Sequence, residues 1–463
     1  MVETATFRKH KIELSEYDFE KDIQNRIWMS QFSLQDVEVL EEILYSSLRV
    51  PVSILEKNLD LTQKQLLPIL EKLSKTGLFE LDSDQVIVDK EMRKYYEFQI
   101  LKFEEDFKPG MDYFQGLLRK VPIHILPAWY SISRTSNNIF ESIVEKYLQS
   151  PQIFQRYLIE IPLSAPAQKG IMNAVYQSPN LEVEAADMMK KFDLSQEEFE
   201  KHMVELEFRL VCCVHYVREK DRFKAVITPF QEWREYLSHV RAAEPSPIYD
   251  EEKIEREKES DYAFVKEMSA LLKAAQGSAL SIDQIPIDQI EKECPDFCED
   301  QIGTLIKKLC EVNLGERDGK SLSQTSDGIT WLKMPPSEQA LFLYRHPLNS
   351  LKATDFPEAL CQERVVREAE KSLSAVVNTG WVFLEEFLHG IFIPLNEEQV
   401  IRLKRCGRSW KYEVPKYSEE EKNFFRALVQ KRLYEAGITA LGTCEGRSCF
   451  CLTPLGKNLF AID

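Results

Sequence analysis

The chain has 463 residues, of which 44% are hydrophobic and 29% are charged, and its formal net charge is −17. This composition is typical of a folded protein rather than a disordered one, and the length predicts about three or four domains instead of a single core. The negative overall field repels nucleic acid, so any contact with DNA or RNA would require a local basic patch.

The N-terminal residues, the apolar segments and the cysteines indicate where in the cell the protein is expected. The first residues, MVETATFRKHKIELSEYDFEKD, carry charges where a secretory signal peptide needs an apolar run. The most apolar later segment, WVFLEEFLHGIFIPL, is interrupted by Glu385, Glu386 and His389, well before the roughly 20 residues that span a bilayer. The ten cysteines are spread over a long chain, many at apolar positions. We therefore expect a cytoplasmic protein without a membrane partner.

Four places along the chain share one pattern, in which an amphipathic helix ends at a turn-forming residue and a short hairpin with a polar tip follows. In LLPILEKLSKTGLFELDSDQVIVD the leucines at helical spacing end at Gly77, which suits a left-handed helix cap. Leu210, Asn313 and Gly437 occupy the corresponding position in the other three places. The pattern predicts one hairpin after Asn313 and others near residues 78–88, 210–228 and 438–453.

The segments beside these hairpins predict further helices. PVSILEKNLDLTQKQL reads as a short helix, a turn and a second helix capped by Thr62. EAADMMKKFDLSQEEFEKHM repeats this order, with Ser195 and Glu198 as a capping box. After two of the hairpins, Thr228-Pro229 and Thr453-Pro454 supply an N-cap followed by proline in the first helical turn.

This element order, with the motifs LSKTGLF, LYEAGI and LTPLG, resembles the winged helix-turn-helix superfamily. The resemblance implies a mostly α fold with small β-hairpins (α+β), built of tandem winged-helix modules joined by helical segments. The predicted segments are an N-terminal extension at 1–33, winged helices at 34–97, 163–240 and 262–335, a helical connector at 98–162, an acidic linker at 241–261, and a helical segment plus a C-terminal winged helix at 336–463.

A second resemblance concerns the C-terminal quarter. NTGWVFLEEFLHGI is similar to the helical and winged-helix accessory regions, outside the motor, of bacterial helicase-like proteins related to the repair helicase XPB. The chain has no GxxxxGK[ST] phosphate loop, so the resemblance does not imply ATP hydrolysis. HExxH and GxSxG motifs are also missing, and we predict neither an enzymatic activity nor a cofactor.

Two hairpins carry cysteines that raise the question of a metal site. In LVCCVHYVREKDRFKAVITPF, strand alternation places Cys213 and His215 on one face and Cys212 on the other. Because a tetrahedral zinc site needs about four ligands, we interpret these cysteines as small apolar residues and expect less than one zinc per chain. In the last hairpin three thiols share one side and remain the stronger metal candidates: Cys444, Cys449 and Cys451.

One stretch, RLKRCGRSWKYEVPK, opposes the net charge of the chain. Its six cations stand against Glu413 alone, a local balance of six minus one, or +5, and aromatic residues are interleaved with them. Cations beside aromatic rings suit phosphates and stacked bases. With basic positions of the following helix, the predicted nucleic-acid-binding residues are Arg402, Lys404, Arg405, Arg408, Trp410, Lys411, Tyr412, Lys416, Arg426, Lys431 and Arg432.

Two functional hypotheses follow, because winged helices serve more than one purpose. The first is a non-enzymatic tandem winged-helix protein associated with nucleic acid or transcription, which binds nucleic acid through its C-terminal module. The second is an interaction scaffold whose acidic winged helices contact only protein. A protein partner is expected under both.

Overall fold

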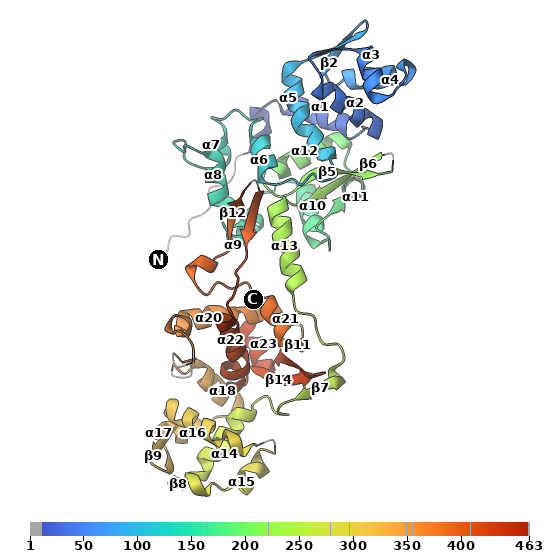
Figure 1. The fold of residues 1–463 in the computed structure, drawn as a ribbon. Helices are drawn as coiled ribbons and strands as arrows, with labels where there is room; N and C mark the ends of the chain where they lie inside the picture. The colour runs from blue at the N-terminus through green and yellow to red at the C-terminus, as the bar shows by residue number, and fades with distance from the viewer. Residues whose placement is uncertain are drawn as a thin grey trace. The chain divides into compact units, whose positions relative to one another are not determined.

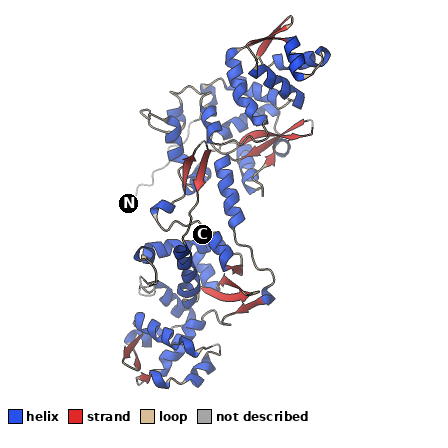
Figure 2. Cartoon of the chain, in the orientation of Figure 1, coloured by secondary structure: helices blue, strands red, loops and turns tan. Residues whose placement is uncertain are grey.

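The computed structural model describes residues 12–461, except 164, 221, 278, 296, 348–350, 353–354 and 408. The chain forms two compact units: unit 1 contains Met1–His239 and Arg402–Glu413, and unit 2 contains Val240–Ile401 and Val414–Asp463. Helices dominate both units, and the strands form small antiparallel sheets (Figures 1 and 2), which confirms the predicted fold class. None of the described helices is long and apolar enough to cross a bilayer.

Unit 1 contains two copies of one arrangement, called here a hairpin module, in which a helix, a short strand, two helices and a β-hairpin follow one another. The first copy consists of α2 (Leu34–Tyr45), β1 (Arg49–Pro51), α3 (Val52–Leu59), α4 (Gln63–Ser74), β2 (Phe79–Asp82) and β3 (Gln85–Val88). The second consists of α10 (Pro166–Gln177), β4 (Val183–Glu184), α11 (Ala185–Phe192), α12 (Gln196–Phe208), β5 (Cys213–Glu219) and β6 (Arg222–Thr228). The last strand is central in both sheets, β1-β3-β2 and β4-β6-β5.

Unit 2 contains two more hairpin modules. The third consists of α14 (Ala263–Ala274), β8 (Leu280–Ser281), α15 (Ile287–Glu293), α16 (Ile302–Glu311), β9 (Gly315–Asp318) and β10 (Ser321–Gln324). The fourth consists of α20 (Glu363–Glu370), β11 (Val382–Phe383), α21 (Leu384–His389), α22 (Glu419–Ala427), the π-helical turn η9 (Leu428–Leu433), β14 (Thr439–Cys444) and β15 (Arg447–Leu452). The four predicted hairpins are therefore confirmed.

The residue that ends the last helix before each hairpin has the left-handed conformation that the sequence predicts. The φ angles are 71° at Gly77, 61° at Leu210, 57° at Asn313 and 64° at Gly437. After the last of these, the Ile438 amide donates a 2.9 Å hydrogen bond to the Leu433 carbonyl, which closes the helix end. In each module, therefore, one residue with positive φ ends the helix and directs the chain into the hairpin.

We expect Gly437→Ala to destabilise its hairpin more than Gly77→Ala does. Positive φ costs about 1–2 kcal/mol for any residue with a Cβ, so both variants lose that amount. At Gly437 an added Cβ would also lie 2.7 Å from a ring carbon of Tyr262 and 3.1 Å from the Asp261 carbonyl oxygen, whereas nothing lies within 4 Å at Gly77. Hydrogen exchange of the hairpin amides measures the two losses. Equal losses would show that the contact with Tyr262 contributes nothing.

The predicted N-terminal extension, residues 1–33, contains α1 (Phe19–Met29), which is packed into unit 1. Arg26 Nη2 on α1 lies 2.6 Å from Glu207 Oε2 on α12, and Lys102 Nζ lies 3.0 Å from the other oxygen of Glu207. Asp22 Oδ1, also on α1, lies 2.7 Å from Lys120 Nζ. The charges of α1 resemble a solvated helix face in the sequence, but they pair inside the protein.

The predicted acidic linker, 241–261, is also more than a connection. Within it β7 (Ile254–Arg256) pairs antiparallel with β14, so that the sheet of the fourth module has the order β11-β15-β14-β7. The amide of Glu257 continues the pairing with a 3.0 Å hydrogen bond to the Leu441 carbonyl. An edge strand pairs through its backbone, so its charged side chains can face solvent.

The predicted last segment, 336–463, does not form one body. In the fourth module the chain between α21 and α22 carries an additional hairpin, β12 (Arg402–Cys406) with β13 (Ser409–Glu413), which belongs to unit 1. The helical layer of unit 1 that holds this hairpin contains α6 (Met111–Leu118), α8 (Ile139–Ile143), the π-helical turn η3 (Val144–Leu148), α9 (Pro151–Glu160) and α13 (Gln231–Ala243) as far as His239.

Candidate nucleic-acid interface

The basic stretch found in the sequence forms the β12–β13 hairpin, and its register divides the side chains between two faces. Successive residues of a strand point to opposite sides, so cross-strand partners share a face. The outer face carries the pairs Arg402↔Glu413, Lys404↔Lys411 and Cys406↔Ser409, and the inner face carries Leu403↔Tyr412 and Arg405↔Trp410.

The hairpin lies beside the helices of unit 1 (Figure 1), and its inner face fixes it there. Tyr412 is only 8% exposed, and its hydroxyl donates a 2.9 Å hydrogen bond to the Leu148 carbonyl. The Leu403 amide donates a 2.9 Å hydrogen bond to the carbonyl of Gln149, between η3 and α9. Burial raises the pKa of Tyr412 well above its ordinary value, so the hydroxyl remains a donor.

Aromatic contacts complete this attachment. The Tyr412 ring lies 5.8 Å from the Trp233 ring and 5.4 Å from the Tyr236 ring, both on α13. The half-buried Trp410 ring meets Phe140 of α8 edge-on, with centroids 5.8 Å apart. Tyr412 therefore anchors the hairpin instead of contacting a ligand, and Trp410 has one side already covered.

The cations of the hairpin remain exposed. Lys404 Nζ lies 2.6 Å from Glu413 Oε2, but none of the ion pairs found among the described residues involves Arg402, Arg405 or Lys411. Lys404 and Lys411 are direct cross-strand partners. Like charges directly opposite each other destabilise a sheet, and a bound anion would offset their repulsion. Arg408, also predicted to bind nucleic acid, lies outside the described residues. The exposed cations of a rigid hairpin form the candidate site.

The residues beyond the hairpin that the sequence predicts to bind nucleic acid belong to unit 2, and they differ in exposure and in ion pairing. Lys416 is exposed. Arg426 donates through Nε and Nη2 to the two carboxylate oxygens of Glu385, at 3.0 and 3.1 Å. Arg432 is only 6% exposed and donates to Glu370 at 2.9 Å. Arg426 and Arg432 are therefore neutralised within the protein, and only tertiary structure reveals their partners.

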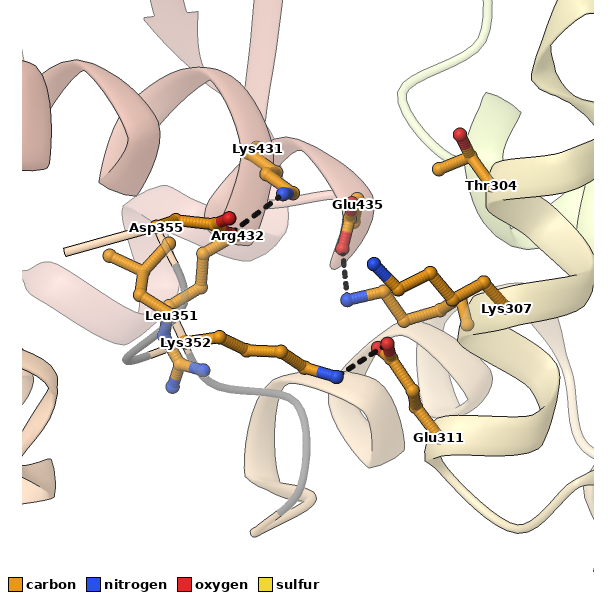
Figure 3. A pocket seen from close by; sticks show the side chains of 10 residues that line it. Thr304, Lys307, Glu311, Leu351, Lys352, Asp355, Lys431, Arg432 and Glu435 are labelled. Carbon is orange, nitrogen blue, oxygen red and sulfur yellow. Dashed lines mark hydrogen bonds and ion pairs between the residues drawn. The ribbon is translucent and has the colours of Figure 1, made fainter.

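Lys431 lines a pocket of about 130 Å³ in unit 2, shown in Figure 3. Its Nζ lies 3.7 Å from Asp355 Oδ2. Elsewhere in the pocket Lys352 pairs with Glu311 at 2.5 Å, and the buried Lys308 pairs with Glu435 at 2.6 Å. Because carboxylates already face most of these cations, this pocket is a poorer anion site than the hairpin.

The three cysteines of the last hairpin share one face, as the sequence predicts. Cys444 and Cys449 are buried in a small cluster with Trp381, and Cys451 packs against it. Burial raises the pKa of Cys449 and of Cys451 to about 11, which favours thiols over the thiolates that bind zinc. Among the described residues no three His, Cys, Asp or Glu side chains are arranged to hold a metal ion.

The cysteines of the second module also have packing roles. Cys212 and Cys213 are buried, and the Cys213 thiol donates to the Thr228 carbonyl at 3.6 Å. His215 Nε2 lies 3.9 Å from Glu182 Oε1. Burial is the largest influence on His215 and lowers its pKa, so the ring is neutral near pH 7.

No protein-family model matches the sequence, and no curated protein resembles it significantly. The candidate interface is thus defined by its own geometry: the exposed cations of β12–β13, held on unit 1 by Leu403, Trp410 and Tyr412.

Proposed function

We propose that the chain is a non-enzymatic protein built of tandem winged helices, associated with nucleic acid, and that it holds a phosphate backbone on the β12–β13 hairpin. The element order of the four hairpin modules supports the winged-helix assignment, since each places two helices before a two-stranded wing. The observation that carries the proposal is a set of exposed cations that take part in none of the ion pairs among the described residues, in a chain whose net charge is −17: Arg402, Arg405 and Lys411.

The attachment of the hairpin makes these cations effective. A two-stranded hairpin alone is marginally stable in water, but this one is held by buried Tyr412 and Leu403. The backbone positions of the cations are therefore fixed before a ligand arrives, which reduces the entropy lost on binding. Contacts to phosphate position a protein without reading sequence, so the hairpin supplies binding that depends little on base sequence.

The modules themselves favour a second role, contact with protein. On the last helices of the first and fourth modules, two of the cations that would enter a DNA groove pair with carboxylates of the same chain. Lys72 of α4 lies 2.6 Å from Asp36, and Arg426 of α22 lies 2.9 Å from Glu385. An interaction scaffold that uses acidic winged helices is accordingly the alternative function.

Charge reversal tests the proposal. Arg402→Glu and Lys411→Glu are each expected to weaken binding of the full chain to DNA of any sequence. Each lost phosphate contact should also reduce the steepness of log K against log salt by roughly 0.9 for duplex DNA. Fluorescence anisotropy at several salt concentrations measures both effects.

Arg156→Glu is the matched control, because it changes the net charge equally on α9, where Arg156 already pairs with Glu160 at 2.9 Å. It should bind as the wild type does. If the hairpin variants behave like this control, the hairpin is not the interface.

A further inference from the structure

A groove of about 730 Å³ lies in unit 1, and one of its walls also supports the basic hairpin. The groove is lined by the end of α6, the turn that follows, and residues 136–140 at the start of α8. Phe140 belongs to this lining, and its ring centroid lies 5.8 Å from that of Trp410 on β13. The groove and the hairpin therefore form adjoining surfaces of one unit.

The floor of the groove is apolar. Leu118, Val121, Leu126 and Phe140 are buried side chains that line it, and Ile123 at its rim is 72% exposed. Contiguous apolar surface that is rimmed by polar residues is a feature of ligand-binding grooves. An apolar floor of this kind accepts a flat ring system.

The polar lining has a composition suited to nucleobases. Gln115 and Asn137 are exposed, and their amides offer both a donor and an acceptor, like the edges of bases. Arg119 is exposed at the rim, and none of the described ion pairs involves it. Lys120 Nζ, by contrast, is bound to Asp22 at 2.7 Å. No carboxylate is among the residues that line the groove, although the chain as a whole is strongly acidic.

We propose that this groove receives unpaired bases of a single-stranded nucleic acid whose phosphates lie against the basic hairpin. The inference rests on the proposed function and names its substrate class. Arg405 is the cross-strand partner of Trp410, so their Cβ atoms are about 4.5–5.5 Å apart. A cation thus adjoins the aromatic pair that borders the groove, as required for a strand that alternates phosphate and base.

A duplex does not fit the same description. Its bases are stacked on one another and paired, so their faces and pairing edges are not available to a groove. Single strands expose both, and stacking on aromatic side chains tolerates every base. The surface is therefore expected to prefer single strands over duplexes, with little preference for sequence.

The test uses the full chain with a labelled oligothymidine, an oligouridine and a duplex of the same length. Ile123→Asp, which adds a carboxylate to the groove rim, is expected to weaken binding to both single strands at least about fivefold, the lower end of what one stacked base contributes. Duplex binding, which uses the hairpin alone, should be unchanged. The control is Ile159→Asp, since Ile159 is 78% exposed on α9 and borders a different groove. It should alter neither affinity.

The outcomes separate this inference from the proposed function. If the hairpin reversals weaken binding but Ile123→Asp binds single strands like the wild type, the groove does not receive bases and the hairpin proposal stands. An equal loss for single strands and duplex, with unchanged circular dichroism, also overturns the groove. If the wild type binds no nucleic acid, both proposals fail. Binding of an apolar peptide, lost in Ile123→Asp while single-strand binding persists, would assign the groove to a protein partner instead.

Discussion

Replacing Glu207 by glutamine is expected to lower the free energy of unfolding of unit 1 by about 3–5 kcal/mol, the usual cost of breaking a buried ion pair. Glu207 is fully buried, and its two carboxylate oxygens accept hydrogen bonds from Arg26 Nη2 at 2.6 Å and Lys102 Nζ at 3.0 Å. Both cations are themselves buried. The neutral amide would remove the carboxylate that faces Lys102 and would leave Arg26 with the more distant Asp22, at 3.5 Å, in a region of low dielectric.

The pH dependence has a definite sign. Burial by itself raises the pKa of Glu207, but Arg26 and Lys102 outweigh it and hold the pKa at about 2, below the ordinary value of 4.5. The native state therefore favours the carboxylate more than the unfolded state does. This stabilisation is complete above pH 4.5 and is lost as the pH falls towards 2. The pKa of Asp22 is lowered in the same direction by Lys120 and Arg26, against its own burial, so it adds to the loss in acid.

Urea unfolding at neutral and acid pH measures both effects, and Glu197→Gln is the matched control. Glu197 lies on the same helix and pairs with Lys201 at 2.6 Å, but both side chains are exposed. Surface pairs contribute little to stability, so this variant should unfold like the wild type at every pH. Equal losses for the two variants would show that burial of the Glu207 network does not matter.

Tyr412→Ala is expected to cost about 3 kcal/mol or more in local stability, because a buried aromatic side chain and its hydrogen bond are removed together. Without this anchor a two-stranded hairpin is marginal in water. Binding to nucleic acid should then fall as far as it does in the double variant Arg402→Glu/Lys411→Glu, although no charge has changed.

Hydrogen exchange across residues 402–413 reports the loss of the anchor, and anisotropy reports the loss of binding. Tyr412→Phe serves as the control, since it removes only the hydrogen bond to the Leu148 carbonyl and keeps the packing against Trp233 and Tyr236. Its cost should be about 1 kcal/mol, with most of the binding retained. Undiminished binding by Tyr412→Ala would mean that the position of the hairpin is irrelevant.

The repeated modules are predictable from the sequence because their signals are local. A helix that ends at Gly77 or Gly437 and continues into alternating residues specifies its own cap and hairpin. Leu210 lacks the conformational freedom of glycine. Its positive φ is nevertheless predicted correctly, because Leu210 occupies the same place in its repeat as Gly77, Asn313 and Gly437 do in theirs. The short strands β1, β4, β8 and β11 cannot be predicted in this way. Each has only two or three residues, too few for a recognisable sequence pattern, and each pairs with a strand far away in the sequence.

In the fourth module, an irregular spacing of apolar residues in the sequence corresponds to a π-helical turn in the structure. Its apolar spacing before Leu433 slips by one residue, through Val429 and Phe425, relative to the other modules. The structure has the π-helical turn η9 at this place, and a π-turn accommodates one additional residue. Val429 and Phe425 remain buried as a result.

The candidate site is predictable only in part. Charge clustering identifies the segment from Arg402 to Lys416, but not its division into an inner and an outer face or its attachment to unit 1. Arg432 looks as available as Arg402 in the sequence, yet it is paired with Glu370, which lies far away along the chain. Ion-pair partners that lie this far apart in the sequence are brought together only by the tertiary fold, so the sequence does not reveal them.

The most direct test of the central claim is a titration of the full wild-type chain with DNA at two salt concentrations. With contacts from Arg402, Arg405 and Lys411, the slope for duplex DNA is roughly −2.7, so affinity should fall about 40-fold between about 50 and 200 mM salt. For a single strand the slope is roughly −2.1, which gives a fall of about 20-fold. Binding at the lower concentration with these falls is the predicted result. No binding at about 50 mM salt, or an affinity that does not change with salt, would contradict an interface made by these cations.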